Sequence, residues 1–190
     1  EYNQNIDIGY RFKGDVSAFN LTSFYMKRNN LQVNISSQQD SSNPNSFYFY
    51  TSNASTGYNM GWNLDFKIMV SNNFEFYSNI GLLKTKITNY SYMTDQSTTI
   101  EFQEREASHA PLYTVSLGFT KHYKKFNFGV NLEGKDKFYF SDSHNQESQA
   151  YLIANSYFDY QLNSNTIISL WSKNIFNKQY AVRGFYFGLE

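Results

Sequence analysis

The sequence predicts an all-β protein: a segment of an antiparallel transmembrane β-barrel whose strands follow one another as meander hairpins. Three observations predict this fold: hydrophobicity that alternates with a period of two, connections that alternate in length, and a high share of aromatic residues. Tyr and Phe supply 17 and 18 residues, yet the mean hydropathy of −0.59 is that of a polar chain. This composition suits strands that have one face in lipid and the other in water.

The alternation starts close to the N-terminus. Apolar Ile6, Ile8 and Tyr10 are separated by polar or small residues. The clearest strand is 58–68, where apolar and polar residues alternate without exception. Its apolar members are Tyr58, Met60, Trp62, Leu64, Phe66 and Ile68. We therefore expect one wholly apolar and one wholly polar face.

The same pattern returns along the rest of the chain. It is regular at 74–82, 113–120 and 126–133, and it is less strict at 151–161 and 165–173. We therefore predict about eight strands, several of them longer than the roughly 9 to 11 residues that cross a bilayer.

Connection lengths predict the orientation of the strands. Short turns fall near 13–15, 71–73, 123–125 and 162–165, and long polar segments fall near 39–46, 91–110, 141–149 and after 174. All short turns therefore lie at one end of the sheet. Outer-membrane barrels show this asymmetry, with tight periplasmic turns and long extracellular loops.

Charge and composition exclude several classes of protein. The chain has 16 basic and 16 acidic residues in a dispersed arrangement, which argues against nucleic-acid binding. It has no cysteine, and no apolar run approaches the roughly 18 to 20 residues of a membrane helix. The first residue is Glu1 rather than Met, so we interpret the chain as a fragment.

Aromatic residues gather toward expected strand ends, at 47–50 and 138–140. Amphipathic rings suit the boundary between lipid and water, and we place these residues there. The alternative is the aromatic edge of a soluble β-sandwich, which would need a second sheet to cover its apolar faces.

The most specific pattern lies in YLIANSYFDYQLNSNTIISLWSKNIFNKQYAVRGFYFG at 151–188. It resembles the C-terminal region of TonB-dependent receptors, where a penultimate strand ends close to L-W-x-K-N-L-F-D-K-x-Y and an Arg-Gly-Phe stretch follows. Ile175 stands where Leu is usual, and Asn177 where Asp is commoner. The motif positions are otherwise occupied by Leu170, Trp171, Lys173, Asn174, Phe176, Lys178 and Tyr180, then Arg183, Gly184 and Phe185, and we count Asn177 with them as part of the motif. We assign this motif an architectural role without ligand contact.

Weaker resemblance extends to EYNQNIDIGYRFKGD, FNLTSFYMKRNNLQV and HAPLYTVSLGF, and so covers nearly the whole chain. It implies that residues 1–190 form part of an outer-membrane barrel of about 22 strands with a plugged lumen. The plug domain and the final strand of the family would lie outside this chain.

The resemblance also implies a function. Such a receptor is a multi-pass protein of the Gram-negative outer membrane that binds a scarce nutrient, most often a ferric siderophore, and imports it. The TonB complex would act through the N-terminal region outside this chain, and neither a cofactor nor enzymatic activity is expected. The alternatives are a passive porin-type channel and a small structural or adhesion barrel.

Candidate site residues carry a weaker signal. We interpret His109, His122 and His144 as surface histidines, because none has a spaced metal-ligating partner. A charged group in the longest loop is interpreted as solvated, or alternatively as lining a ligand path. This group consists of Glu101, Glu104, Arg105 and Glu106.

Two further groups are candidates for contact with a plug or a ligand. We expect Asn63, Asp65, Lys67, Asn79, Asn131 and Glu133 to face the lumen, where they bind a plug domain or simply wet the channel wall. The aromatic residues Tyr139, Phe140, Tyr186 and Phe187 either stack on a ligand or anchor the barrel at the lipid boundary.

Overall fold

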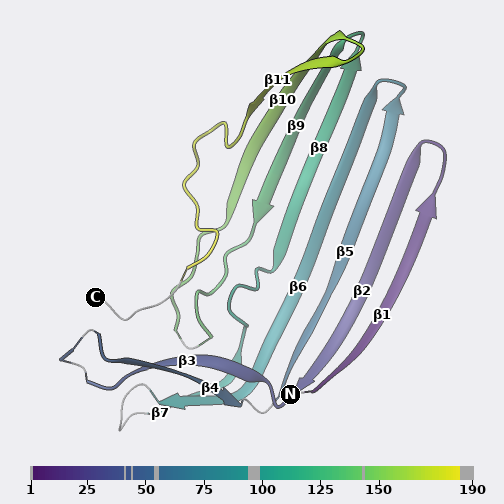
Figure 1. Ribbon diagram of the computed structural model, residues 1–190. Helices are drawn as coiled ribbons and strands as arrows, with labels where there is room; N and C mark the ends of the chain where they lie inside the picture. The colour runs from purple at the N-terminus through teal and green to yellow at the C-terminus, as the bar shows by residue number, and fades with distance from the viewer. Residues whose placement is uncertain are drawn as a thin grey trace.

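The computed structural model describes residues 2–40, 42–43, 45–53, 56–93, 99–142 and 144–184, and these residues form strands and irregular segments. No helix long and apolar enough to cross a membrane occurs in those ranges. Eight strands follow one another as antiparallel neighbours in one sheet (Figure 1). They are β1 (Tyr2–Lys13), β2 (Ser17–Asn29), β5 (Thr56–Ser71), β6 (Phe74–Met93), β8 (Tyr113–Tyr123), β9 (Phe126–Lys135), β10 (Tyr151–Asn163) and β11 (Thr166–Ser172). The prediction of an all-β meander is confirmed.

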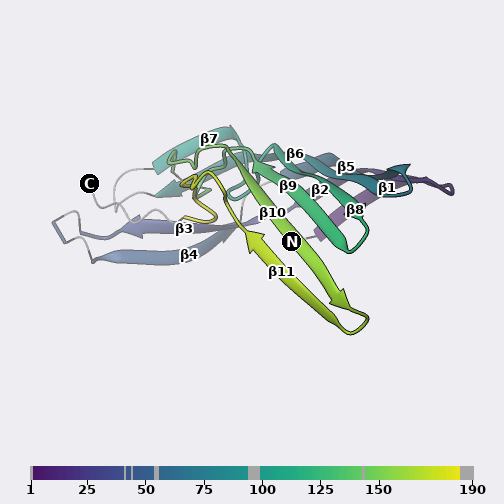
Figure 2. The same cartoon turned by 90° about the horizontal axis from the view of Figure 1, so that it is seen from above.

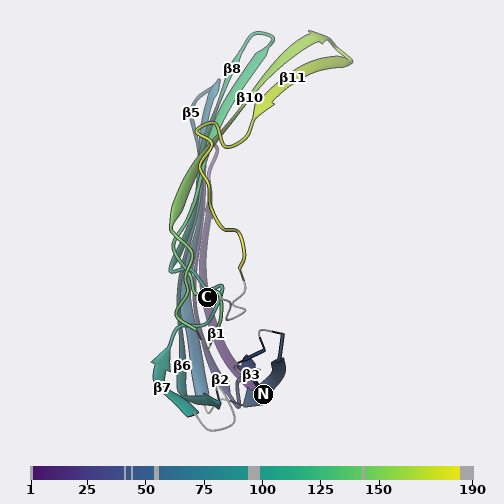
Figure 3. The ribbon, with the colours of Figure 1, turned by 90° about the vertical axis from the view of Figure 1, so that its left-hand side faces the viewer.

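The sheet is curved and open. Seen from above, its strands lie along an arc (Figure 2), and seen from the side they bend along their length (Figure 3). The edge strands β1 and β11 each pair with a single neighbour, so the described sheet does not close into a barrel.

The ends of the sheet differ as predicted. The β1–β2, β5–β6, β8–β9 and β10–β11 turns all lie at one end, at the top of Figure 1, and the long connections gather at the other end. Lys124 in the β8–β9 turn has a φ of 52°, and its left-handed backbone allows the chain to reverse within two residues.

Three of the described strands, which lie beside or within the long segments, were not predicted by the alternation. β3 (Gln32–Gln38) and β4 (Phe47–Asn53) form a separate hairpin, and the predicted polar segment 39–46 is its tip. β7 (Thr99–Arg105) pairs with the extended end of β6, inside the segment expected to be a loop. Consecutive aromatic residues and short strands carry no clear period, so both elements escape a search for alternation.

The aromatic run at 47–50 therefore does not mark the end of a barrel strand. It belongs to β4, where the rings of Tyr48 and Tyr50 stack at 5.6 Å and those of Phe47 and Phe49 lie 6.5 Å apart. The run does begin a strand, but that strand belongs to the separate hairpin and not to the eight-stranded meander, and a position at the lipid boundary stays a prediction.

Strand register carries each face of β5 across its neighbours. Trp62 lies opposite Ser23 and Leu82, whereas Asp65 lies opposite Asn20 and Asn79. Since directly opposite residues share a face, the sheet has a continuous apolar face and a continuous polar face. The Trp62 indole N–H donates to the Ser23 hydroxyl at 2.9 Å, which satisfies the polar end of a ring on the apolar face.

The hydrophobic core is small and lies mainly toward the long-loop end. Its fully buried residues include Leu31, Ile87 and Phe138, whereas Ile8 and Leu170 on the apolar face are 71% and 67% exposed. An apolar face this exposed is typical of a surface that contacts lipid or another protein.

Candidate functional site

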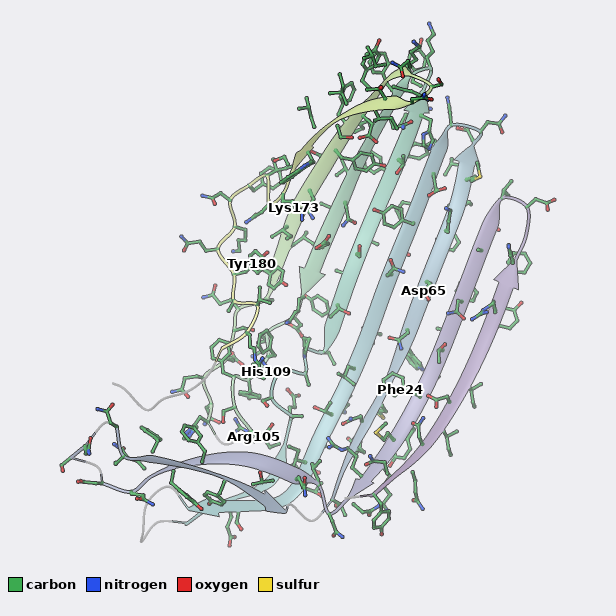
Figure 4. All side chains as sticks on the ribbon, in the orientation of Figure 1. Phe24, Asp65, Arg105, His109, Lys173 and Tyr180 are labelled. Carbon is green, nitrogen blue, oxygen red and sulfur yellow. The ribbon has the colours of Figure 1, made fainter. Side chains whose placement is uncertain are left out.

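The polar face contains a hollow of about 700 Å³ centred on β5, β6, β8 and β9. Asp65 lies at the middle of the sheet (Figure 4), where its two carboxylate oxygens accept hydrogen bonds from flanking strands. The amide of Asn20 donates at 3.1 Å and that of Asn79 at 2.7 Å. The three side chains form a polar bridge across β2, β5 and β6.

Glu133 makes an equivalent bridge on the later strands. Its Oε1 accepts from the amides of Asn131 at 2.6 Å and Asn155 at 3.1 Å, while the Ser116 hydroxyl donates to the Asn131 amide oxygen at 3.1 Å. Both Asp65 and Glu133 line the hollow. The polar face therefore presents two anionic centres whose orientation is fixed by amide donors.

All six residues expected to face the lumen lie on this polar face. Register places Asn63, Asp65 and Lys67 there on β5, and Asn79, Asn131 and Glu133 on the strands that follow. Lys67 forms a 2.8 Å ion pair with Glu75 of β6. What these groups bind remains a prediction.

The connection between β7 and β8, the connection between β9 and β10, and the segment after β11 pack together at the loop end. The first two are called the two long connections below. We call the packed group the loop cluster and define it as residues 105–112, 136–142, 144–150 and 173–184. Phe140 lies against Gly184, where a built Cβ would meet its ring at 2.5 Å, and the rings of Phe138 and Phe140 meet edge to face at 5.7 Å. Residues distant in sequence thus form one packed unit.

Arg105 joins β7 to the second long connection. Its guanidinium donates to the Asn145 side-chain oxygen at 2.9 Å, to the Ser141 carbonyl at 3.2 Å and to the carbonyl of His144, and it lies 4.5 Å from the Tyr139 ring centroid. The residue is 6% exposed. Our interpretation of the charged group as solvated is therefore wrong for Arg105, because carbonyl oxygens and the face of the Tyr139 ring contact its guanidinium in place of water.

The other members of that charged group remain at the surface. Glu101, Glu104 and Glu106 are exposed, and Glu104 forms an ion pair with Lys86. Glu104 and Glu106, together with Arg105 and Tyr139, border a separate hollow of about 460 Å³ beside the loop cluster.

Two histidines are half-buried in the loop cluster. The pKa of His144 lies at about 4, because burial disfavours the charged ring and the Arg105 guanidinium repels it. Burial also lowers the pKa of His109, with a further contribution from Arg183 and Lys135, and its ring lies 5.4 Å from that of Phe138. The surface interpretation is wrong for these two residues.

His122 is exposed at the end of β8, as expected, and its Nδ1 lies 2.6 Å from the Asn127 amide oxygen. In the ranges given above, no group of three or more His, Cys, Asp and Glu is arranged to hold a metal ion.

Phe138 occupies the interior of the loop cluster. It is 4% exposed, and the Lys135 ammonium lies 4.1 Å from its ring centroid. The expected lipid-boundary position is therefore wrong for Phe138, because the second long connection folds back over the sheet end. Tyr186 and Phe187 lie outside the described residues.

The C-terminal motif begins on β11 and continues as an irregular segment beside β10. Leu170 and Trp171 are exposed on the edge strand, and the Lys173 ammonium lies 5.7 Å from the Trp171 ring. The ring of Tyr180 packs against that of Tyr151 of β10 with centroids 4.2 Å apart and planes inclined by 30°, and Figure 4 shows Tyr180 along the segment that runs from Lys173 toward the loop cluster.

Asn174 makes three hydrogen bonds that fix this segment and attach it to β10. Its backbone N–H donates to the Asn155 side chain, and its own side chain bonds both the carbonyl and the N–H of Lys178, each at 2.9 Å. Asn174 and Asn177 both have a φ of 49°, a conformation that Asn adopts more readily than most residues. Phe176 is 79% exposed, so it makes little contact with the rest of the described chain.

Sequence reasoning missed the role of Arg105. Its burial depends on carbonyl groups some forty residues away, which no local pattern encodes. The only available signal was a lone Arg among three Glu residues on a segment with weak alternation.

Comparison with known proteins places this geometry in context. A family model described as TonB-dependent receptor-like β-barrel matches residues 1–177. No individual curated protein matches the sequence significantly.

Solved structures match the fold. The ferric yersiniabactin uptake receptor FyuA from Yersinia pestis aligns over 97% of this chain and 26% of its own, with a TM-score of 0.75 and 15% identity. The siderophore receptor PiuA from Acinetobacter baumannii aligns over 96% of this chain and 25% of its own (TM-score 0.75, 15% identity). The copper transporter OprC aligns over 94% and 26% (TM-score 0.75, 13% identity). The chain thus spans about a quarter of each of these proteins.

Proposed function

Because the chain belongs to the family of TonB-dependent receptor-like β-barrels, we propose that it forms part of the barrel wall of an outer-membrane receptor that imports a scarce nutrient. The family match over residues 1–177 carries this proposal. The two-faced sheet supports it, since the apolar face suits lipid and the polar face suits an aqueous or plugged lumen. The long connections would then lie outside the cell and the short turns in the periplasm.

We propose a ferric siderophore as the imported nutrient. Solved structures with the same fold support this choice, since they include a ferric yersiniabactin uptake receptor and a siderophore receptor. A copper transporter shares the fold equally well, so the choice between metals must be made by experiment.

The polar hollow around Asp65 and Glu133 has a place in this proposal. A plug domain supplied by another part of the receptor would hydrogen-bond to these carboxylates and to the amides that flank them. Import would then require the TonB complex to act on the plug. The chemistry is non-covalent, so no enzymatic activity is proposed.

We propose an architectural role for the C-terminal motif. The contacts of Asn174 with Asn155 and Lys178, and of Tyr180 with Tyr151, support it, because they attach the segment after β11 to β10. These groups are already engaged within the chain, which supports an architectural role over contact with a ligand.

The test is uptake by cells that carry the complete receptor containing this chain. Radiolabelled iron bound to siderophores, and labelled copper in parallel, would be supplied to cells with and without the receptor and with and without TonB. We expect iron uptake that requires both proteins. Uptake that persists unchanged without TonB would identify a passive channel instead, and copper uptake without iron uptake would replace the proposed cargo.

A further inference from the structure

Three lysines interrupt the apolar face at its long-loop end. Lys27 of β2 lies opposite Tyr58, which in turn lies opposite Lys86 of β6. Lys84 of β6 lies opposite Met60, one step nearer the middle of the sheet on the same face. Strand register therefore gathers these charges on β2 and β6, the two strands that flank β5, although they are separated in sequence.

The charge on this face has one sign. In the described part of the eight meander strands, every charged side chain on the apolar face is a lysine, and the fourth is Lys121 at the short-turn end. Lys86 is paired with Glu104. Lys27 and Lys84 are exposed, and within the described ranges neither amino group has an ion-pair or hydrogen-bond partner.

The spacing of the lysines matches the thickness of a membrane. Lys121 lies opposite Phe74, and Lys84 is ten residues further along the same strand β6. At about 3.3 Å per residue and a tilt of about 40°, this separation corresponds to a height of about 25 Å, the height of the apolar band of an outer-membrane barrel. Lys84 and Lys121 therefore lie at the two opposite boundaries of that band.

An apolar groove lies beside Lys84. It has a volume of about 340 Å³, and its lining includes Tyr25, Met60, Trp62, Leu82, Lys84 and Leu112. The groove opens on the face that meets lipid. Lys84 borders it, and Lys27 is the next residue of β2 on the same face after Tyr25. The groove is therefore lined mainly by apolar side chains and is cationic where Lys84 borders it.

We propose that Lys27, Lys84 and this groove bind a phosphorylated, acylated glycolipid of the outer leaflet. An acyl chain lies along Met60 and Trp62, while the ammonium groups of Lys27 and Lys84 extend to the headgroup and contact its phosphates. The eight meander strands carry no acidic side chain on this face in their described part, and Glu104 of β7, which lies on the same face, is neutralised by its ion pair with Lys86. The site is separate from the import path, but it depends on the long connections facing outward.

The test uses the complete purified receptor in detergent and diphosphorylated lipid A as the probe. Native mass spectrometry would compare lipid retention by the wild type, the double variant Lys27→Gln/Lys84→Gln, and the single variant Lys121→Gln. The last is a matched control because it removes the same charge from the same face at the opposite boundary. We expect about 30-fold weaker retention for the double variant and little change for the control.

Two further measurements keep the inference testable if the double variant folds poorly. Lys27→Arg/Lys84→Arg should retain the lipid, because it keeps both charges. Wild-type receptor should prefer the diphosphorylated lipid to the same lipid without phosphates, and free inorganic phosphate should not displace it. Equal retention with and without phosphates, or an equal loss in Lys121→Gln, would overturn the inference.

Discussion

The phenol ring of Tyr77 on β6 lies directly over Gly118, its register partner on β8. A Cβ built on Gly118 would fall less than 3.0 Å from the ring, closer than real Cβ atoms approach. Tyr157 covers Gly129 in the same manner on the next strand pair, and its hydroxyl lies 3.0 Å from that of Thr120. The polar face therefore uses glycines to seat aromatic rings flat on the sheet.

We predict that Gly118→Ala destabilises the receptor by about 1 to 3 kcal/mol, because the new methyl group displaces the Tyr77 ring. The free energy of unfolding in lipid vesicles would be measured by urea titration. Gly9→Ala is the control, since a Cβ there meets nothing nearer than 3.8 Å. Combining Gly118→Ala with Tyr77→Ala should cost less than the two single changes together, and full additivity would contradict the packing explanation.

Arg105 should hold the two long connections together. Arg105→Gln removes charge-assisted hydrogen bonds to Asn145 and to the Ser141 carbonyl, so we expect local opening of 136–150 to become about 2 kcal/mol easier. Hydrogen exchange of that segment would report the change while the meander strands stay protected. Lys137→Gln is the control, because its 3.0 Å ion pair with Glu147 is largely exposed and contributes little. Equal effects of both variants would refute this role for Arg105.

His144 should make the loop cluster sensitive to pH. Its pKa is lowered from 6.5 to about 4, so the folded cluster keeps the ring neutral in a range where an opened segment binds a proton. Stability of the cluster therefore falls as pH drops from about 6.5 to about 4 and changes no further below that range. Hydrogen exchange of 136–150, corrected for intrinsic rates at each pH, would show the fall. His144→Gln should remove most of it, and a variant with unchanged pH dependence would assign the effect to other groups.

Asn174 should be sensitive both to its conformation and to its side chain. Asn174→Ala loses the two hydrogen bonds to Lys178. It also leaves an alanine at a φ of 49°, a backbone conformation that alanine adopts less readily than asparagine. We therefore expect about 2 kcal/mol of local destabilisation of 173–184. Asn174→Gly relieves only the backbone conformation and should fall between the wild type and Asn174→Ala. Protease cleavage rates in this segment would rank the three proteins, and cleavage of Asn174→Gly as fast as Asn174→Ala would show that φ contributes nothing.

Strands with strict alternation could be predicted from the sequence because two solvents act on them at once. The predicted strand 58–68 lies within β5, and its neighbours in register extend the same two faces. Each apolar or polar position is thus decided locally, by which side of the sheet the residue occupies. Turn length was equally informative, since each short connection joins neighbouring strands.

The loop cluster could not be predicted in the same way. The burial of Arg105 and Phe138 arises from contacts between connections that lie far apart in sequence, and neither segment has a period that indicates its partner. The β3–β4 hairpin was missed for a related reason, because a run of four consecutive aromatic residues fits no single face.

The alternation of faces along each strand also limits how such a chain can change in length. Removing one residue between Trp62 and Asp65 would turn every side chain beyond that point onto the opposite face, so that Asp65 would move to the apolar face and Phe66 to the polar face. Removing two residues restores the pattern and merely shortens the strand. Tolerated insertions and deletions within the strands should therefore come in even numbers, whereas the connections at the long-loop end accept odd and even changes alike.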